Sequence, residues 1–161
     1  MLSCAERIHL SLSEPNKPNP PPIGERYRFP LTSILESKSL VFLILDGYFR
    51  LDESLFITTH PITMFPSLKS LSLRGVYVND AQVLHYLVSS CPMIENLTSN
   101  NCSGGLEYVR IQNLPKLKKF LFRGPQEVGV HLAPSLELFQ YTATGSNGAP
   151  YIDTTTLKST L

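Results

Sequence analysis

The stretch SLKSLSLRGVYVNDAQVLHYLVSSCP, residues 67–92, decides the fold. It opens with Leu68, Leu71 and Leu73 in the spacing L-x-x-L-x-L, where the last two leucines alternate with polar residues as they do in a half-buried strand. A turn at Gly75 follows. A helical pattern then runs up to the final Cys-Pro, where proline cannot continue a helix.

The helical part of this stretch has both of its ends marked. Asn79 or Asp80 can cap its start, and we expect it to end at about Ser90 or Cys91. Its apolar residues share one face, which is the arrangement of a helix packed on a core: Val83, Leu84, Leu87 and Val88. A strand followed by such a return segment is one coil of a leucine-rich repeat.

Four further segments carry the same three-position signature. They are Leu40/Leu43/Leu45, Ile94/Leu97/Ser99, Leu117/Phe120/Phe122 and Leu136/Phe139/Tyr141. Their spacing is close to the roughly 20 to 29 residues of leucine-rich coils. The sequence therefore predicts an α/β leucine-rich repeat solenoid of about five coils, after a partial first coil around Ile8. The strands should form a parallel ladder on the concave face, with short helices and loops behind it.

Some segments fall outside this regular series. Leu106, Val109 and Ile111 repeat the spacing halfway between two coils, which predicts one extra strand on the convex face. A helical turn or two is expected at 29–35. The solenoid should occupy residues 1–142, with a proline-rich connecting loop at 13–23, and residues 143–161 are expected to form a disordered tail.

Composition excludes several functional classes. The 161 residues are 42% hydrophobic and 17% charged with a net charge of +1, so we predict neither a nucleic acid nor a membrane as partner. The start lacks the pattern of a secretory signal, and no apolar run approaches the roughly 20 residues of a membrane span. Three cysteines without a C-x-x-C pair favour a reducing compartment. The predicted location is intracellular, cytoplasmic or nuclear.

No pattern of catalytic chemistry is present. The four histidines have no ligand spacing to cysteines or carboxylates, and no nucleotide-binding or nucleophile motif occurs. We therefore predict no enzyme activity, no metal site and no cofactor. Cys91, between apolar residues, is expected to be buried.

One basic cluster stands out, and a solvated strand edge is favoured over phosphate binding because Phe120 and Phe122 occupy inward positions. It comprises Arg110, Lys116, Lys118, Lys119 and Arg123.

The amino-acid sequence of three coils resembles the leucine-rich region of plant F-box proteins of the F-box/LRR and FBD type. The runs that carry the resemblance are LTSILESKSLVFLILDG, FPSLKSLSLRGVYVNDAQVLHYLVSSCPMIENL and LEYVRIQNLPKLKKFLFRG. The resemblance implies a substrate receptor of a ubiquitin ligase, in which an F-box docks on a Skp-type adaptor and the repeats present a protein target. No stretch resembles an F-box, so adaptor binding is expected only if a missing F-box is restored.

The candidate partner-binding residues alternate with the inward leucines and should line the concave face. They are Phe42, Ile44, Asp46, Ser70, Ser72, Arg74, Asn96, Thr98, Lys119, Leu121, Arg123, Leu138 and Gln140. Apolar residues toward both ends of this polar series favour a protein partner, although they could equally abut missing neighbouring coils. Two hypotheses follow: a protein-interaction module whose target is unknown, or a truncated, non-functional structural remnant of such a receptor.

Overall fold

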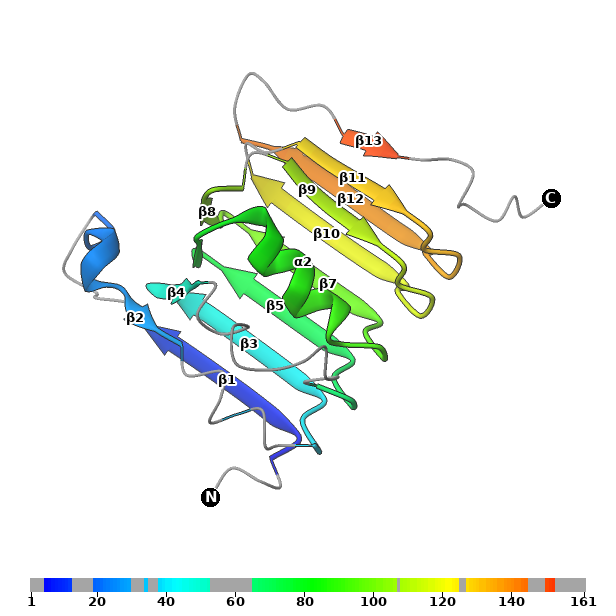
Figure 1. The fold of residues 1–161 in the computed structure, drawn as a ribbon, viewed down its shortest axis with the longest axis horizontal. Helices are drawn as coiled ribbons and strands as arrows, with labels where there is room; N and C mark the ends of the chain where they lie inside the picture. Colours follow the sequence, from blue (N-terminus) through cyan, green and yellow to red (C-terminus); the bar gives the residue numbers. More distant parts are fainter. Residues whose placement is uncertain are drawn as a thin grey trace.

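Six parallel strands lie side by side in the computed structural model, which describes residues 5–12, 19–29, 34, 38–52, 65–106, 108–124, 127–144 and 150–152 (Figure 1). The sheet order is β1-β3-β5-β7-β10-β12, so each strand is followed by a return segment before the next. The bounds are β1 Arg7–Leu12, β3 Phe42–Gly47, β5 Ser70–Arg74, β7 Asn96–Asn100, β10 Lys119–Gly124 and β12 Leu138–Ala143. The predicted parallel ladder of a leucine-rich repeat fold is confirmed.

The register of the ladder places equivalent repeat positions opposite one another. Leu43 pairs with Leu71, and Leu71 pairs with Leu97. The segment predicted as a partial first coil pairs with β3 from Arg7 to Leu12. It therefore contributes a strand as long as its neighbour.

A repeated hydrogen-bond pattern fixes this register where the strands begin. The carbonyl of Lys69 accepts the N–H groups of Glu95 and Asn96 at 2.8 and 2.9 Å. One coil later, the carbonyl of Glu95 accepts the N–H groups of Lys118 and Lys119 at 2.8 and 3.0 Å. The carbonyls of Glu6, Val41 and Lys118 accept equivalent pairs. The strand of each coil thus pairs with the strand of the preceding coil, and the register is the same each time.

The inward rows of the ladder form a continuous apolar core. Leucines dominate from β3 to β7, and aromatic rings take over toward β12, where the centroids of Phe120 and Phe139 are 5.5 Å apart. Ser99 occupies the last signature position of its coil and is only 2% exposed, which agrees with its predicted inward position. The core is one cluster that extends from Ile8 to Ala133.

Helix α2 (Ala81–Ser89) has the predicted ends. The Asp80 side chain accepts a hydrogen bond from the backbone N–H of Gln82, which caps the first turn. The buried residues of the helix are the four predicted from its periodicity, Val83, Leu84, Leu87 and Val88. Helix α2 lies in front of β5 and β7 in Figure 1 and closes the core there.

A second layer continues from α2 across the inner side of the ladder. Its sheet has the order β13-β11-β9, with bounds β9 Tyr108–Gln112, β11 Glu127–His131 and β13 Pro150–Ile152. The Leu106 segment, predicted as the one extra strand opposite the ladder, supplies β9. The layer is larger than predicted, because Val128 and Val130 also alternate inward although their segment contains no leucine signature.

Very short strands form a third sheet where the chain leaves the ladder. The order is β2-β4-β6-β8, with bounds β2 Tyr27–Arg28, β4 Phe49–Leu51, β6 Tyr77–Val78 and β8 Ser103–Gly104. These strands did not emerge from the sequence because two or three residues are too few to show a period of two.

Several predicted segments lie partly outside the described residues. The helical turn expected at 29–35 is described only at residues 29 and 34, and the proline-rich loop only from residue 19, before a short 3₁₀ turn, η1 (Ile23–Glu25). Residues 150–152, expected to belong to a disordered tail, pair instead with β11. Backbone pairing with β11 makes residues 150–152 a strand, although their side chains show no periodic pattern.

Gly47 provides a test of how tightly the coils stack. Its φ is 101°, and a Cβ atom at this position would overlap the carbonyl oxygen of Leu12 in the preceding coil. We expect Gly47→Ala to lower the free energy of unfolding by more than about 2 kcal/mol, measured by urea denaturation.

The matched control is Gly24→Ala, since a Cβ on Gly24 meets nothing within 4 Å. This variant should change stability by no more than about 0.5 kcal/mol. Equal stability of the two variants would contradict the stacking described for Gly47.

Candidate functional site

The outer side of the six-stranded sheet is the candidate site. The inward side chains pack into the core that the second layer and α2 help to close, while the alternating side chains point away from it. We call this surface the ladder face. Across β3 to β12 it contains all thirteen residues predicted as partner contacts, and the structure brings them together on one surface.

The ladder face is organised in three rows that run across the strands. The first is Arg7, Phe42, Ser70, Asn96, Lys119 and Leu138; the second is His9, Ile44, Ser72, Thr98, Leu121 and Gln140; the third is Ser11, Asp46, Arg74, Asn100, Arg123 and Thr142. Each row places one residue per coil beside its equivalent in the next coil. Binding residues far apart in the sequence therefore become neighbours at the spacing of strands, about 4.8 Å.

Three residues of the first strand belong to this face but were not among the predicted contacts. Arg7, His9 and Ser11 are exposed on β1. The guanidinium of Arg7 lies over the ring of Phe42, 4.5 Å from its centroid. Their alternation with Ile8 and Leu10 was the signal that could have identified them.

The three parts of the ladder face differ in chemistry. Phe42 and Ile44 are half-buried and make the β3 part apolar. The middle of the face is half-buried and polar, formed by Ser70, Ser72, Asn96, Thr98 and Asn100. Toward the last strands the exposed residues include Lys119, Arg123 and Gln140, together with Leu138, which is 44% exposed.

A charged row lies just before the strands, at the first variable position of the signature. Glu95 stands between two lysines: its carboxylate is 3.0 Å from Lys118 Nζ and 3.9 Å from Lys69 Nζ. The hydrogen bond from Lys118 and the charges of the lysines hold the pKa of Glu95 below its usual value. The same hydrogen bond raises the pKa of Lys118. This row was not among the predicted contacts, which lie only at the later variable positions of the signature.

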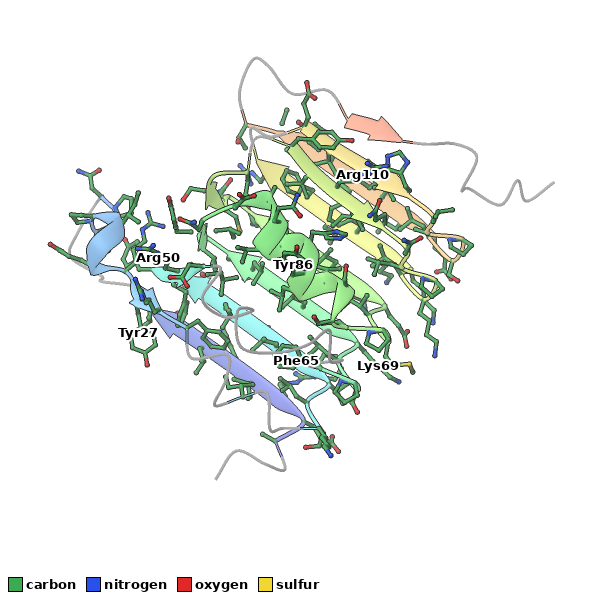
Figure 2. All side chains as sticks on the ribbon, in the orientation of Figure 1. Tyr27, Arg50, Phe65, Lys69, Tyr86 and Arg110 are labelled. Carbon is green, nitrogen blue, oxygen red and sulfur yellow. The ribbon has the colours of Figure 1, made fainter. Side chains whose placement is uncertain are left out.

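The basic cluster predicted from the sequence does not form one patch. Arg110 lies on β9 of the second layer, as Figure 2 shows, whereas Lys119 and Arg123 belong to the ladder face. Lys118 pairs with Glu95, and Lys116 Nζ lies 2.9 Å from the sulfur of Met93. Phe120 and Phe122 are buried as predicted. Five charges close in sequence are thus divided between two sides of the molecule.

The carboxylate of Asp52 and the thiols of Cys91 and Cys102 are buried, where each contributes to the packing of the fold. Asp52 is buried and forms ion pairs with Arg28 and Arg50, at 3.4 and 3.5 Å, which join the ends of β2 and β4. Cys91 is buried, as predicted, and its thiol donates to the carbonyl of Leu87 at 3.1 Å. Burial raises the pKa of Cys91 to about 12 and raises that of Cys102 as well.

Metal binding and membrane crossing can each be judged from the described residues. Among them, no group of three or more histidine, cysteine, aspartate or glutamate side chains could hold a metal ion. No helix in the described part of the chain is long and apolar enough to cross a membrane.

Comparison with known proteins identifies related sequences. The family of leucine-rich repeat regions typified by FBD-associated F-box protein At5g56370 matches residues 9–154. Among the similar proteins of Arabidopsis thaliana, putative F-box/LRR-repeat protein At4g15060 is 30% identical over 116 residues, which is 69% of this chain and 26% of the relative. Putative FBD-associated F-box protein At5g50270 is 30% identical over 113 residues, or 63% of this chain and 28% of the relative.

The matched relatives are much longer than the region they share with this chain. FBD-associated F-box protein At4g10400 is 36% identical over 77 residues, which is 48% of this chain and 17% of the relative. The chain thus spans about a quarter or less of the relatives' length. No solved structure matches it significantly.

The buried thiols lead to a first prediction for this region. Because the thiolate is the nucleophile, the raised pKa of Cys91 should slow alkylation by iodoacetamide at pH 8 by at least about a hundredfold relative to the urea-unfolded chain. Cys102 should be protected in the same direction. Peptide-level mass spectrometry resolves the two sites, and equal rates in the folded and unfolded chain would contradict the burial of these thiols.

The charged row leads to a second prediction. NMR titration should place the pKa of Glu95 below 4.5, its usual value. Since folding lowers this pKa, the pair stabilises the chain above the usual glutamate pKa, and this contribution is lost as the pH falls through the folded value.

Two lysine variants separate the causes of this shift. Lys118→Met should return the pKa of Glu95 toward its usual value because it removes the hydrogen-bond donor. Lys69→Met should move it less, since Lys69 acts only through its charge. Equal effects of the two variants would contradict the dominant role of the Lys118 hydrogen bond.

Proposed function

The chain belongs to the family of leucine-rich repeat regions of FBD-associated F-box proteins, and from this premise we propose that its ladder face binds the protein target of a ubiquitin-ligase receptor. The observation that carries the proposal is that no described helix or strand covers the ladder face. The inward apolar side chains are buried in β3, β5, β7 and β10 and are less buried in β1 and β12, whereas three rows of side chains from six coils remain outside. A large surface built on a rigid sheet is suited to protein binding, since its residues need little ordering when a partner arrives.

The chemistry of the ladder face supports a protein as the partner. Protein interfaces combine apolar anchors with a polar surround. Phe42 and Ile44 supply anchors at one side, Leu121 and Leu138 supply them at the other, and polar side chains lie between.

A second partner belongs to the same proposal but not to this surface. In a receptor of this kind a Skp-type adaptor binds an F-box, which no stretch of this sequence resembles. The adaptor would therefore engage a different part of a longer polypeptide, and the repeats would supply target choice. The proposed place of action is the cytoplasm or nucleus.

The proposal predicts that apolar residues at both sides of the ladder face are needed together. Changing Phe42→Asp and Leu121→Asp in one chain should reduce capture of target proteins from plant extract at least about tenfold, because hot-spot contacts at an interface are apolar and desolvated. Quantitative mass spectrometry of proteins bound to the immobilised chain measures the loss, and direct binding of one purified target confirms it.

The matched control places the same number of new acids at exposed positions outside the ladder face. Tyr86 on α2 is 53% exposed and Leu132 is 57% exposed. The variant with Tyr86→Asp and Leu132→Asp should retain capture. Capture retained by the Phe42/Leu121 variant, or lost equally in both variants, would contradict binding by the ladder face.

Folding of each variant must be checked in the same experiment. A continuous core predicts one cooperative thermal transition by circular dichroism, and the two double variants should keep it. A non-functional remnant would instead capture no specific target, and a weakly folded one would show no such transition.

A further inference from the structure

The last four strands of the ladder face carry cations without matching acids. Among the outward positions of β5, β7, β10 and β12, the charged residues are Arg74, Lys119 and Arg123, and all three are exposed. No aspartate or glutamate occupies an outward position of these strands. This part of the face therefore carries a charge of about +3, although the whole chain has a net charge of only +1.

The nearest acids in the described structure form no ion pairs with these cations. Glu95 is engaged with Lys118 and Lys69 in the charged row, and Glu137 acts on Lys118. Asp46 stands opposite Arg74 in the register, but the two form no ion pair in the described structure. In the part of the chain that the structure describes, Arg74, Lys119 and Arg123 belong to no ion pair.

The spacing along β10 is as informative as the charge. Lys119, Leu121 and Arg123 occupy alternate positions of one strand, so they stand in line about 7 Å apart. Leu121 is half-buried between the two cations, and Leu138 lies beside Lys119 on β12. An extended peptide has the same repeat distance, because its alternate side chains also point to one side.

From this arrangement we infer that the β5–β12 part of the ladder face binds an extended acidic segment of its target protein, with the pattern acid-x-apolar-x-acid. The two acids would pair with Lys119 and Arg123, and the apolar residue would pack on Leu121. Arg74, two strands from Arg123 in the third row, would bind a further acid that follows the pattern. This inference deepens the proposed function, on which it rests, by stating the chemistry of the target.

Charge complementarity favours an acidic protein segment over a nucleic acid. A single-stranded nucleic acid is typically bound by exposed aromatic rings that stack on its bases together with cations for its phosphates. Phe120 and Phe122, the aromatic residues of β10, are buried in the core. The outward residues of the last four strands include no aromatic side chain.

The test uses the 161-residue chain and a fluorescein-labelled peptide that contains Glu-Ser-Leu-Ser-Glu. We expect saturable binding by fluorescence anisotropy that weakens as salt screens the charges. A peptide with Lys-Ser-Leu-Ser-Lys and one with Glu-Ser-Ser-Ser-Glu should each bind at least about tenfold more weakly. Equal binding of all three peptides would overturn the inferred pattern.

Two arginines provide a matched pair of variants. Arg123→Glu reverses a charge on the ladder face, while Arg110→Glu makes the same change on β9 of the second layer, where Arg110 is also exposed (Figure 2). We expect Arg123→Glu to weaken peptide binding at least about tenfold and Arg110→Glu to leave it within about twofold. Equal losses would show non-specific attraction and overturn the inference.

A competition experiment decides between the two classes of macromolecule. A single-stranded RNA of equal charge should not displace the acidic peptide at concentrations where an unlabelled peptide does. Displacement by the RNA at equal concentration would overturn the assignment to a protein segment.

The inference and the proposed function fail in different ways. If Lys119→Glu with Arg123→Glu leaves target capture intact while Phe42→Asp with Leu121→Asp abolishes it, the ladder face is the binding surface and the acidic pattern is wrong. If neither double variant affects capture, the binding surface itself is wrong. Loss of capture and of peptide binding in both double variants, with one thermal transition retained in each, supports the two together.

Discussion

The fold depends on one repeated backbone interaction, the carbonyl that accepts two N–H groups at the entrance of each strand. From Glu6 to Lys118 this contact joins every coil to the next at the same repeat position. A shift of one residue in any coil would turn its leucines outward and its polar residues into the core. Glycines reinforce the constraint, because at Gly47 and Gly104 a side chain would overlap a carbonyl of the preceding coil. Register and close stacking therefore depend on each other.

The same constraint shapes the candidate site. Since the register aligns equivalent positions, each outward residue of one coil lies beside the equivalent residue of the next coil. Arg74 and Arg123 share a row although they are 49 positions apart in the sequence, and the order of strands alone brings them to the same surface. A surface of this kind is held by backbone pairing rather than by its own side chains. Binding to it consequently requires little loss of conformational entropy from the sheet.

Sequence reasoning predicted the parts of the structure that follow a visible period. The signatures at Leu68, Leu71 and Leu73 correctly gave a ladder strand, the capped apolar face of α2 was predicted residue by residue, and all thirteen candidate site residues lie on the ladder face. That a target protein binds to these thirteen residues is still a prediction. The strands of two or three residues were not predicted, because they are stabilised by pairing with neighbouring coils and carry no periodic pattern of their own. The division of the basic cluster was not predicted either. Arg110 and Lys119 are close in the sequence, but the chain passes from β9 of the second layer to β10 of the ladder between them.

Because side chains alternate along each strand, the inward residues stabilise the fold and the outward residues are available for binding. The cations of the ladder face belong to the outward residues. An inward leucine such as Leu71 is fully buried, and its truncation to alanine is expected to cost about 2–5 kcal/mol. An outward residue contributes little to folding, since most surface substitutions change stability by no more than about 0.5 kcal/mol. Arg74, Lys119 and Arg123 are therefore not required by the ladder, and in the isolated chain their like charges repel one another weakly. An acidic partner would remove that repulsion and gain charge-assisted hydrogen bonds from the same groups. The residues that the fold does not need are thus the ones through which this surface can select its target.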